Sequence, residues 1–226
     1  RGGQQDVVLL VNVTDVNEVV RDGTVNGTAG NDNLPIGFTD AQGDQIDGAD
    51  GLNDRIDAGA GNDTVDAGAG NDTVMGGAGD DLLTGGLDND TLFGGDGNDT
   101  LLANFGINEG VFGGAGSDTY RIAGTLVDAF GYNVNLEAGT DQFGRTFGGI
   151  ETVLGGSGND TFTGRNDTSE LLDGGVGNDA LNGGVGNDTV PQRNSEPDTA
   201  THTYRKPALP RTIRRGFGRE GVVDGR

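Results

Sequence analysis

The sequence predicts an all-β, β-helix-like solenoid built from nine-residue repeats, with two repeats in each coil. Three observations lead to this fold class. Close relatives of the motif GGDGNDTLL (94–102) recur every nine residues. One position of the motif is apolar in every aligned repeat. A chain of 226 residues with 46 glycines, 5% aromatic residues and no tryptophan also lacks the large side chains of an ordinary globular core.

The repeat is numbered here with Gly94 as its first position and Leu102 as its ninth. Its sixth position is aspartate in all twelve aligned units, namely Asp32, Asp44, Asp54, Asp63, Asp72, Asp81, Asp90, Asp99, Asp118, Asp160, Asp179 and Asp188. Its eighth position is apolar in the same units, namely Leu34, Ile46, Ile56, Val65, Val74, Leu83, Leu92, Leu101, Tyr120, Phe162, Leu181 and Val190. Positions seven to nine therefore predict a three-residue strand with one inward side chain. The glycine-rich positions one to six predict the bend, so that two units complete an eighteen-residue coil.

The repeats fall into two blocks, at residues 27–121 and 155–190. Residues 122–154 break the period and predict an irregular β linker, in which Val134 and Leu136 alternate around Asn135 as in a strand.

The two ends of the chain differ from the repeats. Residues 1–20 contain DVVLLVNVTDVNE, which resembles the closing strand of a cadherin-like adhesin module. Residues 191–226 hold eight of the fourteen Lys and Arg residues, four of the 36 acids and four of the five prolines, and they predict a disordered basic tail. A shifted reading frame is an alternative explanation of this tail. Because the chain opens with Arg1, we expect it to be a piece of a larger protein.

The net charge of -22 identifies cations as the natural partners of this chain. We expect no nucleic-acid binding, because that affinity comes mainly from lysine and arginine on phosphates. No apolar run approaches the roughly eighteen residues of a membrane helix, so the chain is not expected to span a membrane. The absence of cysteine excludes a disulfide scaffold and cysteine-ligated zinc.

Stacked coils would bring the recurrent aspartates close together. Two units make one coil, so Asp81 would lie between Asp63 and Asp99 on one side, and Asp72 beside Asp90 on the other. Like charges about 5 Å apart repel by roughly 3 kcal/mol at an effective dielectric of 20, and this repulsion must be cancelled. Calcium suits the task, because it takes six to eight oxygens from carboxylates and backbone carbonyls. Turn formation alone would tolerate asparagine at position six, and no aligned unit has it.

The units GGDGNDTLL, GGAGSDTYR and GGVGNDALN resemble the calcium-binding nonapeptide of the repeats-in-toxin (RTX, hemolysin-type) family, over about residues 27–190. The resemblance implies a parallel β-roll that binds several calcium ions in an extracellular bacterial protein, exported by type I secretion and folded by external calcium. Sixth-position aspartates are then side-chain ligands: Asp63, Asp72, Asp81, Asp90, Asp99, Asp118, Asp160, Asp179 and Asp188. Second- and fourth-position glycines would give carbonyl ligands: Gly59, Gly61, Gly68, Gly70, Gly77, Gly79, Gly95 and Gly97. The linker resembles the segment between repeat blocks in serralysin-type carboxy-terminal regions.

Some units depart from the pattern. Asp88 and Gln42 replace the fourth-position glycine, and the runs 48–57 and 103–112 each carry one extra residue, the second with no aspartate. We expect calcium sites there to be distorted or empty.

Three function classes remain open. The first is a calcium-dependent folding module of a secreted adhesin or other exoprotein, with an unknown surface or protein target. The second is the export and stabilising region of a secreted protease, lipase or epimerase. The third is a surface-binding module, for example for ice, but its threonine ladder is interrupted by Leu82 between Thr64 and Thr100. An enzyme is not expected, because the single histidine, His202, lies in the tail and allows no catalytic triad or multi-histidine zinc site.

Overall fold

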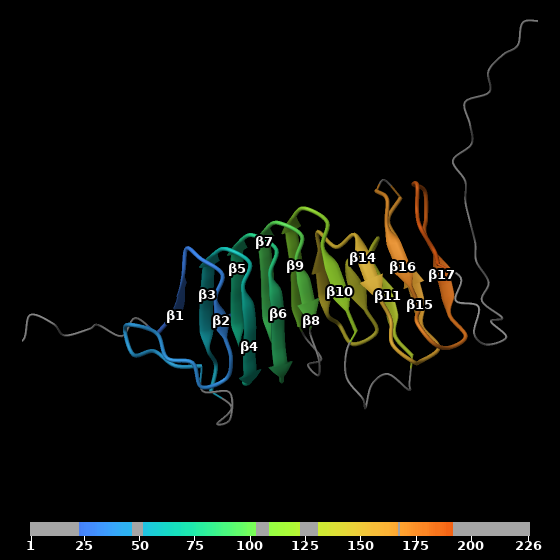
Figure 1. Cartoon of the computed structure of the whole chain (residues 1–226). Helices are drawn as coiled ribbons and strands as arrows, with labels where there is room; N and C mark the ends of the chain where they lie inside the picture. The colour runs from blue at the N-terminus through green and yellow to red at the C-terminus, as the bar shows by residue number, and fades with distance from the viewer. Residues whose placement is uncertain (1–22, 47–51, 103–108, 123–130, 167, 192–226) are drawn as a thin grey trace, which may run out of the picture.

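The strands of the computed structural model stack side by side along one axis, from β1 at one end to β17 at the other (Figure 1). The structure describes residues 23–46, 52–102, 109–122, 131–166 and 168–191. Within these ranges the regular elements are all strands, and they form two sheets that face each other. None of the described segments forms a helix long and apolar enough to cross a membrane. The prediction of an all-β parallel roll is confirmed.

Consecutive strands of the repeat blocks alternate between the two sheets. In spatial order, the ten-stranded sheet contains β1 (Val25–Thr28), β3 (Arg55–Ala60), β5 (Thr73–Ala78), β7 (Thr91–Asp96), β9 (Gly110–Ala115), β13 (Thr146–Gly148), β12 (Thr140–Asp141), β11 (Asn133–Asn135), β15 (Thr161–Thr163) and β17 (Ala180–Asn182). The seven-stranded sheet contains β16 (Leu171–Asp173), β14 (Thr152–Leu154), β10 (Thr119–Arg121), β8 (Thr100–Leu102), β6 (Leu82–Leu87), β4 (Thr64–Ala69) and β2 (Asn33–Leu34).

The register shows that two repeats make one coil, as predicted. Val74 pairs with Ile56 on one side and with Leu92 on the other, each eighteen residues away. Parallel pairing of equivalent positions places the eighth-position side chains of each sheet in one row. All these side chains are buried between the sheets except Val190, which is partly buried against the core. One apolar side chain per repeat therefore builds a continuous core along the roll.

Six strands of the first block, β3 to β7 and β9, are longer than the predicted three residues, whereas β8 and β10 have three. β3 to β7 each contain six residues, because pairing continues from positions seven to nine into positions one to three of the next repeat. The three-residue prediction is correct for β15, β16 and β17 in the second block. The prediction was too short for the six-residue strands because it ignored the backbone pairing that glycine and alanine also provide.

The linker between the blocks adds strands to the ten-stranded sheet. β11 pairs in parallel with β15, and β13 pairs in parallel with β9. β12 lies between them and is antiparallel to both. The chain then crosses to the other sheet at β14, which pairs with β10 and β16. Val134 and Leu136 are buried, as the predicted alternation requires.

One aligned unit does not behave as a repeat. The segment that contains Asp44 forms a short hairpin, in which Thr39 and Gln45 make an antiparallel bridge. The amide of Asp44 donates to Asp40 Oδ1 at 3.0 Å. Asp44 is therefore a turn residue of this hairpin and not a sixth-position aspartate, although Ile46 is buried as the alignment predicted.

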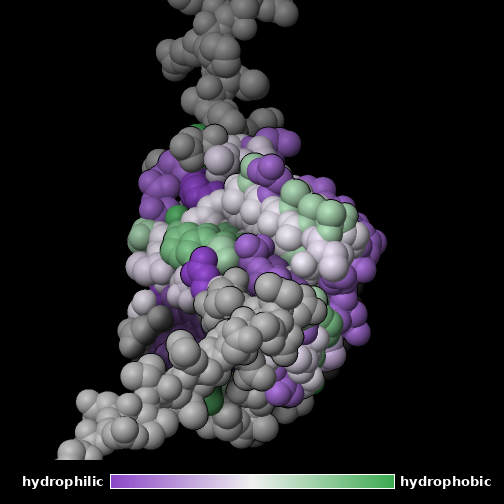
Figure 2. All heavy atoms as spheres, turned by 90° about the vertical axis from the view of Figure 1, so that its left-hand side faces the viewer, coloured by the Kyte–Doolittle hydropathy of each residue, from purple (hydrophilic) through white to green (hydrophobic). Residues whose placement is uncertain are grey.

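The surface of the roll is largely polar. In the space-filling view along the axis, hydrophilic and neutral residues cover most of the described surface, and hydrophobic residues form small separate areas (Figure 2). Leu82 is 40% exposed and pairs with Thr64 and Thr100, which confirms that the threonine row is interrupted.

Candidate metal centre

Acidic residues form two columns along the edges of the roll, each member lying just before a strand or bridge. The first column precedes the seven-stranded sheet and contains Asp32, Asp63, Asp81, Asp99, Asp118, Glu151, Glu170 and Asp188. The second column precedes the ten-stranded sheet and contains Asp54, Asp72, Asp90, Glu109, Asp160 and Asp179. Each turn between two strands therefore ends on an acidic residue, and the next strand begins directly after it.

Hydrogen bonds connect successive members of each column. The amide of Asp63 donates to Asp81 Oδ1 at 2.8 Å, and the amide of Asp81 donates to Asp99 Oδ1 at 2.9 Å. On the other side, the amide of Asp72 donates to Asp90 Oδ1 at 3.0 Å. The three neighbour pairs predicted from the sequence therefore lie across adjacent coils. In each of these pairs, one carboxylate oxygen accepts a hydrogen bond from the preceding coil and so connects the two coils.

The other carboxylate oxygen of these aspartates is buried without a hydrogen-bond partner. This holds for the Oδ2 atoms of Asp63, Asp72, Asp81, Asp90, Asp99 and Asp118. Burial is the main cause that raises the pKa of all six side chains, to about 7 for Asp90 and about 6 for Asp72. A row of buried oxygens of this kind needs a cation or a proton.

The fifth repeat position shows why the sixth is aspartate. Side chains at position five form an exposed ladder of their own, in which the amide of Asp80 donates to Asn62 Oδ1 at 3.0 Å and the amide of Asn98 to Asp80 Oδ1 at 2.7 Å. This ladder needs only one acceptor oxygen, which asparagine supplies. Position six needs the same oxygen and a second one that faces inward, and only a carboxylate supplies both. Turn formation alone does not explain this difference.

Glycine backbones complete the edges of the first block. Gly77 has φ +107°, and a Cβ atom on it would meet the carbonyl oxygen of Gly59 in the preceding coil. At position four, Gly79 has φ +125°, and a Cβ atom on it would meet the carbonyl oxygen of Gly61. These carbonyls therefore point along the roll from one coil to the next. Any larger residue would meet them.

Position one also leaves space beside the carboxylates. A Cβ atom on Gly94 would meet both Asp99 Oδ2 and the carbonyl oxygen of Gly113. Within the described ranges, no three acidic, histidine or cysteine side chains form a compact metal-binding cluster. A cation at these edges must therefore take one or two carboxylate oxygens and draw its remaining ligands from backbone carbonyls. Calcium accepts such a mixed oxygen set, so the residues fit this ion.

The predicted ligands divide between the two edges. Asp63, Asp81, Asp99, Asp118 and Asp188 lie in the first column, with Gly59, Gly61, Gly77, Gly79, Gly95 and Gly97 in the strands and turns that lead to it. Asp72, Asp90, Asp160 and Asp179 lie in the second column, which Gly68 and Gly70 precede. Asp160 and Asp179 are separated from Asp90 by the strands of the linker.

Sequence reasoning missed three members of the columns. Glu109 and Glu170 are buried, Glu151 is partly buried, and all three stand where the repeats have aspartate. The run 103–112 contains no aspartate, but Glu109 supplies a carboxylate at this place in the column. A signal was present, since each glutamate lies two residues before a buried apolar residue: Val111, Val153 and Leu172. That spacing equals the spacing between positions six and eight.

The irregular unit at Asp88 is strained. Asp88 has φ +74°, and it is the one non-glycine residue with positive φ among the described residues. It stands where other repeats have the fourth-position glycine. The Asp88 carboxylate also contributes to the raised pKa of Asp72 and Asp90 through charge repulsion, after burial.

A family model for the RTX calcium-binding nonapeptide repeat matches overlapping segments of the chain at residues 40–74, 48–83, 67–101, 75–109, 146–168 and 171–190, which together cover half of its length. The chain belongs to the RTX repeat family. The residues matched include the whole second column, all of the first column except Asp32, Asp118 and Glu170, and most of their glycines. A search of the curated proteins found no match to the chain.

Membership of the RTX family establishes calcium as the ion that these repeats bind. The matched segments end at residue 109 and resume at residue 146. The gap contains β9 to β12. It includes the repeat unit GGAGSDTYR (113–121) and the linker strands β11 and β12.

Proposed function

We propose that this chain folds around several calcium ions held along the two carboxylate columns. The observation that carries the proposal is the row of six buried Oδ2 atoms without hydrogen-bond partners, each beside a glycine-rich turn. Without a cation, these groups would have to take up protons or repel one another. With calcium between the coils, the same groups would join each coil to the next.

The proposed ligands are the sixth-position aspartates, with carbonyls of the second- and fourth-position glycines. Regular sites would lie along β3 to β9, where successive coils keep the same register. In the second block, the proposed ligands are Asp160, Asp179 and Asp188, and the strands there are shorter. Each ion would bind between two coils, so that binding and stacking are coupled.

We further infer that the chain is a calcium-dependent folding module of a larger secreted bacterial protein, exported by type I secretion. The net charge of -22 supports this role, because such a chain repels itself in low calcium and is neutralised in high calcium. An adhesin is favoured by the strand-like residues 1–20, which lie outside the described residues. The alternative is the export and stabilising region of a secreted metalloprotease, lipase or epimerase, and the sequence of the whole encoded protein would decide between them.

A calcium titration followed by circular dichroism tests the folding proposal. After treatment with a chelator, we expect little β-structure, and we expect β-structure to appear as calcium is raised to the millimolar range. At tenfold excess over its dissociation constant, each ion contributes about 1.4 kcal/mol. Several ions can therefore decide whether a chain with one buried side chain per repeat folds. An unchanged spectrum on adding calcium would contradict the proposal.

A further inference from the structure

Two arginines contact the columns at the positions where glutamate replaces aspartate. The described part of the chain contains four arginines and no lysine: Arg55, Arg121, Arg145 and Arg165. Arg145 and Arg165 make ion pairs with column glutamates. The regular aspartates from Asp63 to Asp99 have no such partner for Oδ2.

Arg145 occupies a position of the second column itself. It lies just before β13, as Glu109 lies just before the neighbouring strand β9. The amide of Thr146 donates to the carbonyl of Glu109 at 2.9 Å, the same bond that connects successive repeats elsewhere in the column. The chain therefore places a guanidinium where the repeats place a carboxylate.

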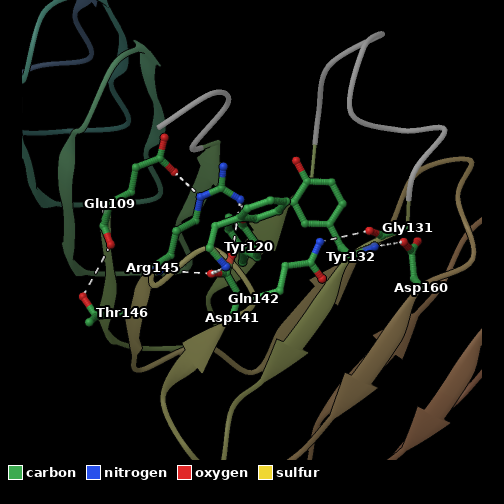
Figure 3. A network of polar contacts seen from close by, with 10 residues as sticks. Glu109, Tyr120, Gly131, Tyr132, Asp141, Gln142, Arg145, Thr146 and Asp160 are labelled. Atoms are coloured by element: carbon green, nitrogen blue, oxygen red, sulfur yellow. Dashed lines mark hydrogen bonds and ion pairs between the residues drawn. The ribbon is translucent and has the colours of Figure 1, made fainter. Parts of the chain in front are cut away.

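The Arg145 side chain joins two carboxylates inside the roll (Figure 3). Its Nε lies 2.7 Å from Glu109 Oε2, and its Nη1 lies 3.3 Å from Asp141 Oδ2. Both carboxylates and the guanidinium are buried. Asp141 reaches this edge because β12 runs antiparallel, so that the end of β12 lies at the edge where the parallel strands begin.

Aromatic rings enclose the same guanidinium. Tyr120 contributes its hydroxyl oxygen at 3.4 Å from Arg145 Nη1, and the rings of Tyr132 and Phe143 lie 5.6 and 5.3 Å from the guanidinium carbon. This contact favours a cation and excludes water, which strengthens the ion pairs. The two carboxylates and the aromatic rings together form a binding site for one positive charge, and the guanidinium of Arg145 occupies it.

Arg165 repeats the arrangement on the other column. Its Nη1 lies 3.6 Å from Glu151 Oε1 and 3.8 Å from Glu170 Oε1. Glu151 and Glu170 are successive members of the first column, since the amide of Leu171 donates to the carbonyl of Glu151 at 2.9 Å. Both edges therefore show the same association of column glutamate with arginine.

We propose that Arg145 and Arg165 are internal counter-ions that replace calcium where glutamate replaces aspartate in the columns, so that the strands around them fold at calcium concentrations too low for the regular coils. A guanidinium is charged at every physiological pH and is covalently part of the chain, so its effective concentration does not depend on the medium. The proposal rests on the proposed calcium dependence of the regular coils.

Hydrogen–deuterium exchange of the whole chain, read by peptides at a series of calcium concentrations, tests the proposal. We expect peptides from 132–148, which cover β11 to β13, to remain protected at calcium concentrations at least tenfold below the midpoint for peptides from 73–101. Equal midpoints for the two sets of peptides would overturn the proposal. If peptides from 73–101 stay protected in chelator, the calcium dependence itself fails, and the variants below still test the ion pairs.

Arg145→Met keeps the length of the side chain and removes its charge. We expect peptides 132–148 to lose protection at low calcium, with a midpoint at least as high as that of 73–101. Arg55→Met is the matched control, because Arg55 is exposed on the same sheet and contacts Met75. Arg165→Met should have a weaker effect on peptides 152–173, because its ion pairs are longer. An Arg145→Met effect no larger than that of Arg55→Met would overturn the assignment.

A double variant separates the charge from simple packing. If Arg145 acts as the counter-ion of Glu109, Glu109→Gln combined with Arg145→Met should recover part of the protection that Arg145→Met loses, because one buried carboxylate, Asp141, then lacks its cation instead of two. If Arg145 only fills space, the double variant should be no better than the single one, and that result would overturn the proposal. Arg145→Lys, which keeps the charge, should retain more protection than Arg145→Met.

Discussion

At the scale of single residues, the sixth-position carboxylate has two separate tasks. One oxygen of Asp81 accepts the amide of Asp63, and the other is buried and has no hydrogen-bond partner. The recurrence of aspartate at this position was enough to predict the column. The direct bond from the amide of one coil to the carboxylate of the next could not be predicted, because it depends on how the turn is oriented.

Asp81→Asn separates these two tasks. Asparagine can still accept the Asp63 amide, but it presents an NH2 group in place of Oδ2. We expect the calcium midpoint in a circular dichroism titration to rise about tenfold, the effect of losing roughly 1.4 kcal/mol of binding. Asp80→Asn is the control, because Asp80 is exposed and asparagine keeps its ladder bond to Asn98. Asp32→Asn should have a smaller effect, because Asp32 lies at the end of the column, and equal midpoints for Asp32→Asn and Asp81→Asn would count against calcium between stacked coils.

Asp88 offers a stabilising substitution. Its φ of +74° disfavours a residue with a side chain by about 1 kcal/mol relative to glycine, and its charge faces a column that is already acidic. We expect Asp88→Gly to raise the free energy of unfolding by about 1 kcal/mol in urea denaturation with saturating calcium. Asp88→Asn keeps the strained side chain and removes only the charge. If the two variants have the same stability, backbone strain contributes nothing at this position.

At the scale of elements, backbone contacts between coils decide where glycine is required. The eighteen-residue coil and its buried eighth position were predicted correctly from periodicity, because each repeat has one apolar residue in the same place. The longer strands of the first block and the order β9–β13–β12–β11 were not predicted. The reversal in the linker depends on long-range pairing that has no period in the sequence.

Gly77→Ala tests the contact between coils without changing any carboxylate. The new methyl group would meet the carbonyl of Gly59, and φ at this position is +107°. We expect a loss of about 2 to 4 kcal/mol in urea denaturation with saturating calcium. Ala78→Gly changes the next residue of the same strand, which is exposed, and should cost only about 0.5 to 1 kcal/mol. Similar losses for both variants would contradict the close approach of the two coils.

At the scale of the whole molecule, the stability of the roll depends on the cations that neutralise the carboxylates at its two edges. Glycine, aspartate and one apolar residue per repeat recur throughout both blocks, so composition and period together predicted the fold class and the ion. The ion pairs of Arg145 and Arg165 with the column glutamates could not be predicted, because no periodic pattern in the sequence aligns either arginine with those glutamates.

Protons should partly replace calcium in the metal-free roll. Burial raises the pKa of Asp72 to about 6 and of Asp90 to about 7, so the folded chain binds more protons than the unfolded chain between about pH 3.8 and pH 7. This contribution to stability is present at low pH and is lost as the pH rises through 7. In chelator, we therefore expect β-structure measured by circular dichroism to increase from pH 8 to pH 5. Asp72→Asn combined with Asp90→Asn should flatten this dependence, and a decrease in β-structure toward pH 5 would show that the sign is wrong.

The spacing between neighbouring column members has a consequence for the evolution of such chains. Asp63 and Asp81 are eighteen residues apart, whereas Asp32 and Asp63 are 31 apart and Asp118 and Glu151 are 33 apart, yet all three pairs make the same amide-to-carboxylate bond. The pitch of the roll is thus independent of the length of chain between two successive members. Insertions and deletions at these two junctions, including whole grafted peptides, should be accepted without a shift in the register of the neighbouring coils.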